Sequence, residues 1–409
     1  MSFKVCLAQL NFVVGDVMGN ARRIVHAARD AQAQGAHLLV TPELALCGYA
    51  AEDLFLRPAF LDACDDALDF ICRETAGLKD LCLVVGHPRR HQVAQAAGVS
   101  VGANATVEGV HAPTAEVRGK SVSVTCLHNA ASVLCGGRVV HTYAKQQLPN
   151  YQVFDERRYF TPGDQTLVFD LAHADGSTLR CGLLICEDAW FDAPAQAAKA
   201  AGAQVLVVIN ASPFHTGKGS EREDTMRERV ASTGLPLVYA HLVGGQDEIV
   251  FEGRSFALNS DGSVAMRAPS FEENMASSHI HVGEGAIVLS GHVAPEHSTE
   301  ADLWHALVLG VRDYVGKNGF PSALLGLSGG IDSALVLAIA VDALGKDRVR
   351  TVMMPSPYTA DISWIDARDM AARLGVRYDE IDIRPHFEDV KSSLAFDFAG
   401  LPEDVAQEN

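Results

Sequence analysis

The sequence lacks the motifs and runs that define several common classes of protein. None of its nine cysteines is spaced as Cys-x-x-Cys, so neither a zinc knuckle nor a thioredoxin-like redox pair is expected. No apolar run comes near the roughly 20 residues that a membrane-spanning helix needs. The polar side chains of Gln9 and Asn11 interrupt the N-terminal stretch too early for a signal-peptide core. We therefore expect a cytoplasmic protein without a membrane partner.

Positive charge is also scarce. The 409 residues carry 33 Lys and Arg against 51 Asp and Glu, which gives a formal net charge of −18. We expect no nucleic-acid partner, because such a chain and a phosphate backbone repel each other. Hydrophobic residues make up 48% and charged residues 21%, a balance typical of globular proteins, and the length suggests two or three domains.

The cysteines themselves indicate a reducing compartment. All nine lie between Cys6 and Cys186, and an odd number cannot be fully paired within one chain. Disulfides are rare where glutathione keeps thiols reduced, so we expect most of these cysteines to be buried free thiols.

Short aliphatic runs alternate with helical segments through residues 1–270, which predicts a layered α/β domain. The predicted strands are bounded by Gly, Asn, Asp or Pro; they are Phe3–Ala8, His37–Thr41, Leu81–Gly86, Arg180–Cys186, Val205–Asn210, Pro236–Ala240 and Arg254–Asn259. The helices predicted between them include Asn20–Gln34, Ala193–Gly202 and Glu221–Ser232. The block near 91–126 has little periodicity, and we interpret it as an insertion that forms either a hairpin or a surface loop.

A second domain follows a change of composition. Ser, His, Glu and Pro accumulate over 271–300, which predicts a linker. Residues 301–409 then begin with an amphipathic helix, Ala301–Val315, followed by a strand at Ala323–Leu327, a Gly-rich turn and further βα units. Repeated βα winding of this kind predicts a parallel sheet.

Three polar side chains of the first domain have the chemistry that nucleophilic catalysis by a thiol requires. Cys186 ends a predicted strand and is followed at once by two acids and a Trp, while Glu43 comes directly after Pro42 at another strand end. Lys145 precedes a loop rich in aromatic and charged residues. A thiol nucleophile needs a base and a group that stabilises the oxyanion. A packed structural Cys, a solvated Glu and a surface Lys remain the alternatives.

A possible phosphate-binding loop lies between a strand and a helix of the second domain. Its residues are Ser328, Gly329, Gly330, Ile331, Asp332 and Ser333. The glycines let the backbone approach a phosphate, and the helix that follows presents free N–H groups to an anion. The carboxylate of Asp332 is a suitable ligand for Mg²⁺. The string is neither a Walker A loop nor G-x-G-x-x-G, and a plain capped strand–helix turn is the alternative.

Several longer strings resemble the family of glutamine-dependent NAD synthetases. In the first domain they are Leu-Pro-Asn-Tyr-Gln-Val-Phe-Asp-Glu-Arg-Arg-Tyr-Phe (148–160), Ile-Cys-Glu-Asp-Ala-Trp (185–190), Ile-Asn-Ala-Ser-Pro-Phe (209–214) and Val-Gly-Gly-Gln-Asp-Glu (243–248). In the second they are the pyrophosphatase-type loop 328–333 and its flanks at 306–314, 317–320 and 354–359. The order Glu43, Lys145, Cys186 also matches the triad of nitrilase-type carbon–nitrogen hydrolases.

The resemblance implies a fold for each domain. Residues 1–270 would form a nitrilase-type α-β-β-α sandwich that acts as a glutaminase, with the insertion near 91–126. After the 271–300 linker, 301–409 would begin a Rossmann-like parallel sheet of the adenine-nucleotide α-hydrolase type. The family's synthetase domain continues further, and Glu408-Asn409 resembles the opening of its next motif, so we expect this sheet to be incomplete and synthesis to fail or to need the missing segment.

The resemblance also implies roles for single residues. Glu43 would take the thiol proton, Cys186 would attack the amide of glutamine, and Lys145 would stabilise the oxyanion. Supporting or glutamine-binding positions would be Tyr151, Glu156, Ser212 and Lys218, with Arg222 as the alternative partner of the substrate carboxylate. Ser328 to Ser333 would bind ATP, with Mg²⁺ on Asp332, and ammonia would convert adenylated deamido-NAD to NAD. The family forms homo-oligomers, so we expect one here.

One departure from the family pattern lies near the glutaminase site. The family shows Asn-Gln where this chain has His241-Leu242, which can alter a polar contact at the pocket or at the ammonia exit. The remaining alternatives for the whole chain are an amidotransferase with another carboxylate acceptor, a stand-alone amidase with a degenerate tail, and a catalytically silent assembly protein. Glutamine-dependent NAD synthesis is the function that the flanking strings favour.

Overall fold

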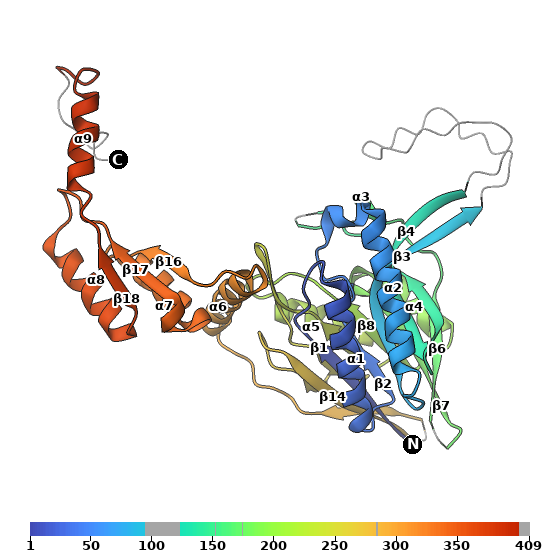
Figure 1. The fold of residues 1–409 in the computed structure, drawn as a ribbon. Helices are drawn as coiled ribbons and strands as arrows, with labels where there is room; N and C mark the ends of the chain where they lie inside the picture. The colour runs from blue at the N-terminus through green and yellow to red at the C-terminus, as the bar shows by residue number, and fades with distance from the viewer. Residues whose placement is uncertain (95–122, 152, 174, 284, 401–409) are drawn as a thin grey trace, which may run out of the picture. The chain divides into compact units, whose positions relative to one another are not determined.

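The computed structural model divides into two compact units, Met1–Ala306 and Leu307–Asn409. The structure describes residues 1–94, 123–151, 153–173, 175–283 and 285–400 (Figure 1). Among these residues, no helix combines the length and the apolar character that crossing a membrane requires.

Two β-sheets form the centre of the first unit. One has seven strands in the order β15-β14-β1-β2-β3-β4-β5: Ile287–Gly291, Asn274–Val282, Ser2–Gln9, Leu38–Val40, Cys82–Ala94, Ser123–Cys135 and Arg138–Ala144. The other has six in the order β13-β12-β9-β8-β7-β6: Val264–Arg267, Phe256–Leu258, Leu237–His241, Val205–Asn210, Thr178–Ile185 and Leu167–Ala172. Strands β1, β2 and β3 are parallel to one another, as are β7, β8 and β9. The carboxyl ends of these parallel strands therefore lie at one edge of each sheet.

The two sheets pack face to face, and the period of two along each strand explains why. In β1, Phe3 and Leu7 join the core between the sheets, whereas Cys6 and Ala8 belong to the core under the helices. All six residues of β8 are buried, because both faces of this central strand are covered.

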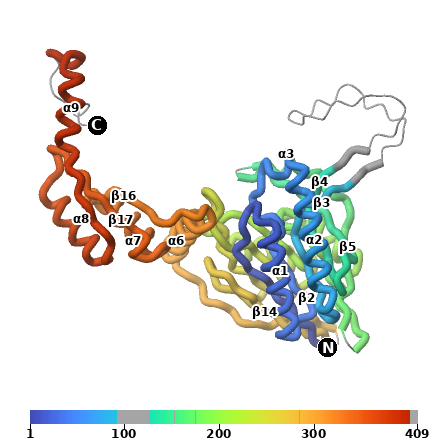
Figure 2. The backbone as a smooth tube through the Cα atoms, in the orientation of Figure 1, coloured from blue at the N-terminus to red at the C-terminus, as the bar shows by residue number. Residues whose placement is uncertain are grey.

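Helices cover the outer faces. Helices α1 (Val17–Ala33) and α2 (Pro58–Thr75) run side by side over the first sheet (Figure 2), and α4 (Asp192–Ala200) and α5 (Lys218–Thr233) cover the second. Helix α1 begins where the carboxylate of Asp16 accepts a hydrogen bond from the backbone N–H of Gly19, at 3.1 Å. The layers are helix, sheet, sheet and helix, so the sequence-based prediction of an α-β-β-α sandwich is confirmed.

Short elements complete the first unit. They are the 3-10 helices η1 (Glu52–Leu56) and η2 (Cys186–Trp190), the one-turn helix α3 (Glu156–Tyr159), and the hairpin of β10 (Val243–Gln246) with β11 (Ile249–Glu252). Helix α3 and η2 each begin at a predicted site residue.

The prediction of a linker over 271–300 is wrong for most of this segment. It contains β14 and β15, and β14 lies inside the first sheet, paired antiparallel to β1 from Ser2↔His281 to Gln9↔Asn274. Ile280 of β14 is 1% exposed, whereas its neighbours His279 and His281 face outward. This half-exposed antiparallel strand is rich in polar residues, which made the segment look like a linker.

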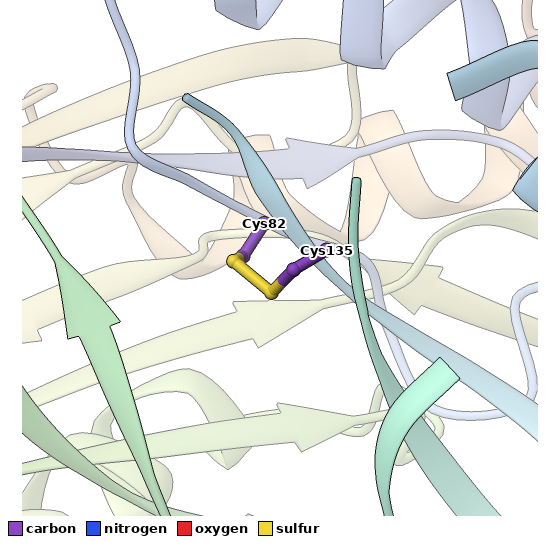
Figure 3. Close-up of a disulfide and its surroundings, with 2 residues drawn as sticks. All are labelled: Cys82 and Cys135. Atoms are coloured by element: carbon purple, nitrogen blue, oxygen red, sulfur yellow. A yellow bond between two sulfur atoms is a disulfide. The ribbon is translucent and has the colours of Figure 1, made fainter. Parts of the chain in front are cut away.

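The block 91–126 lies mostly outside the described residues. Its described ends belong to β3 and β4, which pair antiparallel as a hairpin from Cys82↔Cys135 to Ala94↔Ser123. Where this hairpin starts, a disulfide joins Cys82 to Cys135 (Figure 3). The expectation of reduced cysteines fails for this pair, while seven others are free thiols. Directly opposed residues of two antiparallel strands lie close enough for such a bond.

The second unit holds one parallel sheet. Its order is β16-β17-β18, formed by Ala323–Gly326, Val349–Met353 and Arg377–Glu380. The helices are α6 (Thr299–Lys317), which begins in the first unit, α7 (Ile331–Leu344), α8 (Asp361–Leu374) and α9 (Arg384–Leu394), and η3 is Lys346–Arg348. Residues of α7 and α8 pack on β17 around Leu337, Ala367 and Met353. The predicted βα winding is confirmed.

Candidate active site

The site lies where parallel strands of both sheets end. Glu43 follows β2 in the first sheet, after Thr41 and Pro42, and Cys186 follows β7 in the second. Lys145 comes directly after β5. All three side chains are buried, with exposed fractions of 0%, 2% and 0% for Glu43, Cys186 and Lys145. A carboxylate, a thiol and an ammonium group are therefore buried together, and they come from both sheets.

Lys145 holds two carboxylates together. Its Nζ donates to Oε1 of Glu43 at 2.7 Å and to Oε1 of Glu156 at 2.8 Å. The side-chain amide of Asn129 donates to the same Oε1 of Glu43 at 2.8 Å, and the hydroxyl of Tyr49 donates to Glu156 at 3.1 Å. The predicted residues Glu43, Lys145 and Glu156 thus form one hydrogen-bonded cluster.

The electrostatics of this cluster follow from its burial. Burial alone would lower the pKa of Lys145, but Glu156 and Glu43 outweigh it and raise that pKa well above its ordinary value. Lys145 is therefore a permanent cation, as an oxyanion-stabilising group must be. Burial raises the pKa of Glu156, so this carboxylate takes up a proton more readily than an exposed Glu.

Cys186 has the backbone and the surroundings of a functional residue. Its φ of 47° lies in the left-handed region, which non-glycine residues seldom adopt outside strained or functional turns. Burial raises the pKa of its thiol well above the ordinary value, the charge of Glu43 raises it further, and Lys145 opposes both. The thiol is protonated at neutral pH, so a nucleophilic Cys186 needs a base to remove its proton.

Asp188 ties the Cys186 turn to the Lys145 loop. One carboxylate oxygen accepts from the backbone N–H groups of Gln146 and Gln147 at 2.9 and 2.8 Å. The other accepts from the backbone N–H of Ile185 at 3.1 Å and from the hydroxyl of Tyr143 at 2.8 Å. Burial raises the pKa of Asp188 to about 6. This clamp fixes the positions of two predicted catalytic residues relative to each other.

The remaining predicted residues lie around this centre. Tyr151 is half exposed, and its hydroxyl donates to the carboxylate of Glu187 at 3.1 Å. Nζ of Lys218 lies 4.2 Å from the centre of the Trp190 ring, a cation–π contact. The Ser212 side chain is buried beyond the end of β8.

Arg222, unlike Lys218, is enclosed by the protein. Its guanidinium is buried and pairs with the carboxylate of Glu252 and with the imidazole of His241. These contacts occupy it inside the protein, so of the two candidates for the substrate carboxylate only Lys218 stays within reach of solvent.

The sequence did not single out several residues that complete the site. They are Tyr49, Asn129, Tyr143, Asp188 and Glu252, each with a hydrogen bond or ion pair to the cluster or its supports. Asp188 lies in the recognised string 185–190, which was the available signal. Asn129 is 86 residues from Glu43 and Tyr49 is 107 residues from Glu156, the carboxylates that they bond, so no local pattern encodes these contacts.

In the second unit, the predicted phosphate loop lies between β16 and α7. Gly329 has a φ of 81°, and a Cβ there would overlap the backbone oxygen of Ser363, so only glycine fits. The hydroxyl of Ser333 lies 3.1 Å from that of Ser328 and closes the turn. A cavity of about 400 Å³ is lined by Leu327, Ser328 and neighbouring residues of β17 and the loop after it.

Fold and site together define a carbon–nitrogen hydrolase joined to a nucleotide-activating α/β unit. Residues 4–286 match the carbon-nitrogen hydrolase family, and residues 303–409 match the NAD synthase family. An amidase of the nitrilase superfamily from Nesterenkonia AN1 covers 67% of this chain at 24% identity with a TM-score of 0.51, and the match spans 90% of the amidase; it supports the fold alone.

Relatives that match both units narrow the family. The glutamine-dependent NAD(+) synthetase of Xylella fastidiosa is 40% identical over 99% of this chain and 68% of its own length, and that of Rhodobacter capsulatus is 42% identical over 100% and 67%. The structure of the Acinetobacter baumannii glutamine-dependent NAD+ synthetase, in complex with ADP, covers 100% of this chain and 70% of its own at 35% identity and a TM-score of 0.85. The chain belongs to the glutamine-dependent NAD(+) synthetase family.

Proposed function

We propose that the first unit hydrolyses glutamine to glutamate and ammonia, and that the ammonia amidates deamido-NAD after ATP has adenylated it, with AMP and pyrophosphate released. The observation that supports the glutaminase step most directly is the buried Glu43–Lys145–Glu156 cluster beside the strained turn of Cys186. Family membership supports the second step.

In the first step Glu43 accepts the thiol proton, and Sγ of Cys186 attacks the side-chain amide carbon of glutamine. Lys145 stabilises the oxyanion of the tetrahedral intermediate, since its ammonium is fixed and buried. The protonated Glu43 then returns the proton to the leaving nitrogen, and ammonia departs as the C–N bond breaks.

The thioester is hydrolysed by water. Glu43 takes a proton from this water, and the oxygen of the water bonds to the acyl carbon. The C–S bond then breaks, and the thiolate of Cys186 regains the proton from Glu43. Glu156 orients Lys145 throughout, since it accepts a hydrogen bond from the same ammonium. Lys218 and Ser212 are proposed to hold the amino-acid end of glutamine, and Tyr151 to border the pocket that receives it.

In the second unit the loop 328–333 is proposed to hold the phosphates of ATP. The free N–H groups at the start of α7 face an anion bound there, and Gly329 admits it closely. The exposed carboxylate of Asp332 fits Mg²⁺, which commonly takes one or two carboxylates together with substrate phosphates. When bound, Mg²⁺ would neutralise phosphate charge as pyrophosphate leaves.

Three finer points belong to the same proposal. An enclosed path for ammonia between the two sites would prevent its loss to water. A cytoplasmic location is supported by the seven free cysteines among the described residues. Homo-oligomer formation is supported by large apolar side chains exposed in the second unit, among them Leu335, Ile362 and Phe396.

The proposed function is tested with an electrophilic glutamine analogue and peptide mapping. We expect one adduct, on Cys186, and parallel loss of glutamate release from glutamine. Cys186→Ala should take up no label and release no glutamate. Cys181→Ala is the matched control, because Cys181 is a buried free thiol within β7, the strand that ends directly before Cys186; it should label normally. An unlabelled Cys186 in the folded chain would rule out the glutaminase.

A further inference from the structure

His241 lies at the end of β9, directly beside the strand that leads to the site. It is 0% exposed and pairs in register with Asn210, the last residue of β8. The chain then continues from Asn210 through Ala211 to Ser212, a short strap that borders the catalytic cluster.

The contacts of the imidazole favour one of its two neutral tautomers. Nε2 lies 3.0 Å from the carbonyl oxygen of Ser212, and Nδ1 lies 2.9 Å from a guanidinium nitrogen of Arg222 and 2.7 Å from the carbonyl oxygen of Gly253. A guanidinium can only donate and a carbonyl can only accept. With the proton on Nε2, the ring donates to the Ser212 carbonyl and accepts from Arg222, and the Gly253 carbonyl receives no donor from the ring. With the proton on Nδ1, the ring donates to the Gly253 carbonyl, and Nε2 can accept only from the Ser212 hydroxyl, at 3.5 Å. The first tautomer avoids placing a ring N–H against the charged guanidinium.

The surroundings keep the ring neutral and fixed. Burial lowers the pKa of His241 well below its ordinary value, and the charge of Arg222 lowers it further. The carboxylate of Glu252 pairs with Arg222, and both side chains are buried. His241 is thus a neutral imidazole that donates to the Ser212 carbonyl. Its other nitrogen contacts Arg222, which is paired with Glu252.

The strap in turn contacts the base. The backbone N–H of Ala211 donates to Oε2 of Glu43 at 3.0 Å. The other oxygen, Oε1, already accepts from Lys145 and Asn129. Oε2 is therefore the atom with a free lone pair for a thiol proton, and the Ala211 N–H helps to hold the orientation of the carboxylate.

We propose that His241 is a positioning residue, which holds the strap 210–212 through the Ser212 carbonyl and so orients Glu43 to take the proton of Cys186. The inference rests on the proposed glutaminase function and deepens it. Misplacement of a catalytic group by about 1 Å can cost about 100-fold in rate, so a loosened strap would lower kcat.

The test compares three variants of the full chain in steady-state glutamate release from glutamine. His241→Ala should lower kcat by about 10- to 100-fold while KM changes less than about threefold, because the base and not glutamine binding is disturbed. His241→Gln should keep kcat within about threefold, since its amide nitrogen reaches the place of Nε2 and can donate to Ser212. His241→Asn, whose amide ends near Nδ1, should resemble His241→Ala.

His279→Gln is the matched control, because His279 is exposed on β14; its kcat and KM should equal those of the unmutated chain. Thermal unfolding identifies any variant that does not fold, and if His241→Ala is one, the Gln and Asn variants decide by themselves. Equal kcat for these two, or a loss confined to KM, overturns the inference. If the unmutated chain releases no glutamate, the proposed function fails and takes the inference with it, whereas a fully active His241→Ala overturns the inference alone.

Discussion

Lys145 supplies the positive charge that pairs with the two buried carboxylates of the site. Its ammonium lies between two buried carboxylates, at 2.7 and 2.8 Å from Glu43 and Glu156. A buried ion pair adds little stability as a whole, but the removal of one partner leaves an uncompensated charge. Stability and catalysis therefore respond differently to changes at this position.

Lys145→Met should lower the free energy of unfolding by about 3–5 kcal/mol and kcat by at least about 100-fold. Adding Glu156→Gln removes one of the two unpaired carboxylates, so the double variant should recover part of the stability but none of the activity. Urea unfolding and glutamate release measure the two effects, with Glu156→Gln alone as the control. A double variant no more stable than Lys145→Met would contradict this account.

Sequence reasoning reached the residues that lie inside recognisable strings. Glu43, Lys145, Glu156 and Cys186 were named from the strand ends and the family resemblance, and the structure brings them together, while their catalytic roles stay predictions. Asn129 and Tyr49 were not named, because their importance depends on which oxygen atoms they meet after folding. Such partners become visible only in three dimensions.

At the scale of elements, hydrophobic runs predicted the buried strands well. The predicted strand Val205–Asn210 is β8 as observed, because a strand covered on both faces is apolar throughout. Half-exposed strands are harder to identify. In β14, Ile280 and Ser278 point inward while His279 and His281 face outward, and composition alone then suggests a linker.

This revision of 271–300 has a measurable consequence. Ile280→Ala should lower the free energy of unfolding by about 2–5 kcal/mol, because it removes a buried side chain from the core between the sheets. Val288→Ala on β15 is the control, since Val288 is 50% exposed and should change stability by less than about 0.5 kcal/mol. Equal midpoints of urea unfolding for the two variants would contradict the placement of β14 in the core and would favour a linker.

At the scale of the whole molecule, the net charge is negative although the proposed substrates are also anions. A chain of charge −18 is proposed to bind ATP and deamido-NAD, both anions. In the proposed function the loop 328–333 would bind these anions locally, through backbone N–H groups at the start of α7 rather than through a basic surface. The net charge argues against a polyanionic partner but says little about a small anion held by backbone N–H groups.

The proposed base and the proposed nucleophile come from different sheets, since Glu43 follows β2 and Cys186 follows β7. Each sheet can gain its secondary structure before the two faces meet, but the reactive pair exists only after they dock, and contacts between distant parts of a chain form slowly. The recovery of glutamate release therefore reports when the two sheets have docked. After dilution from denaturant, far-ultraviolet circular dichroism should recover before glutamate release, and coincident recovery would mean that the sheets form and dock in a single step.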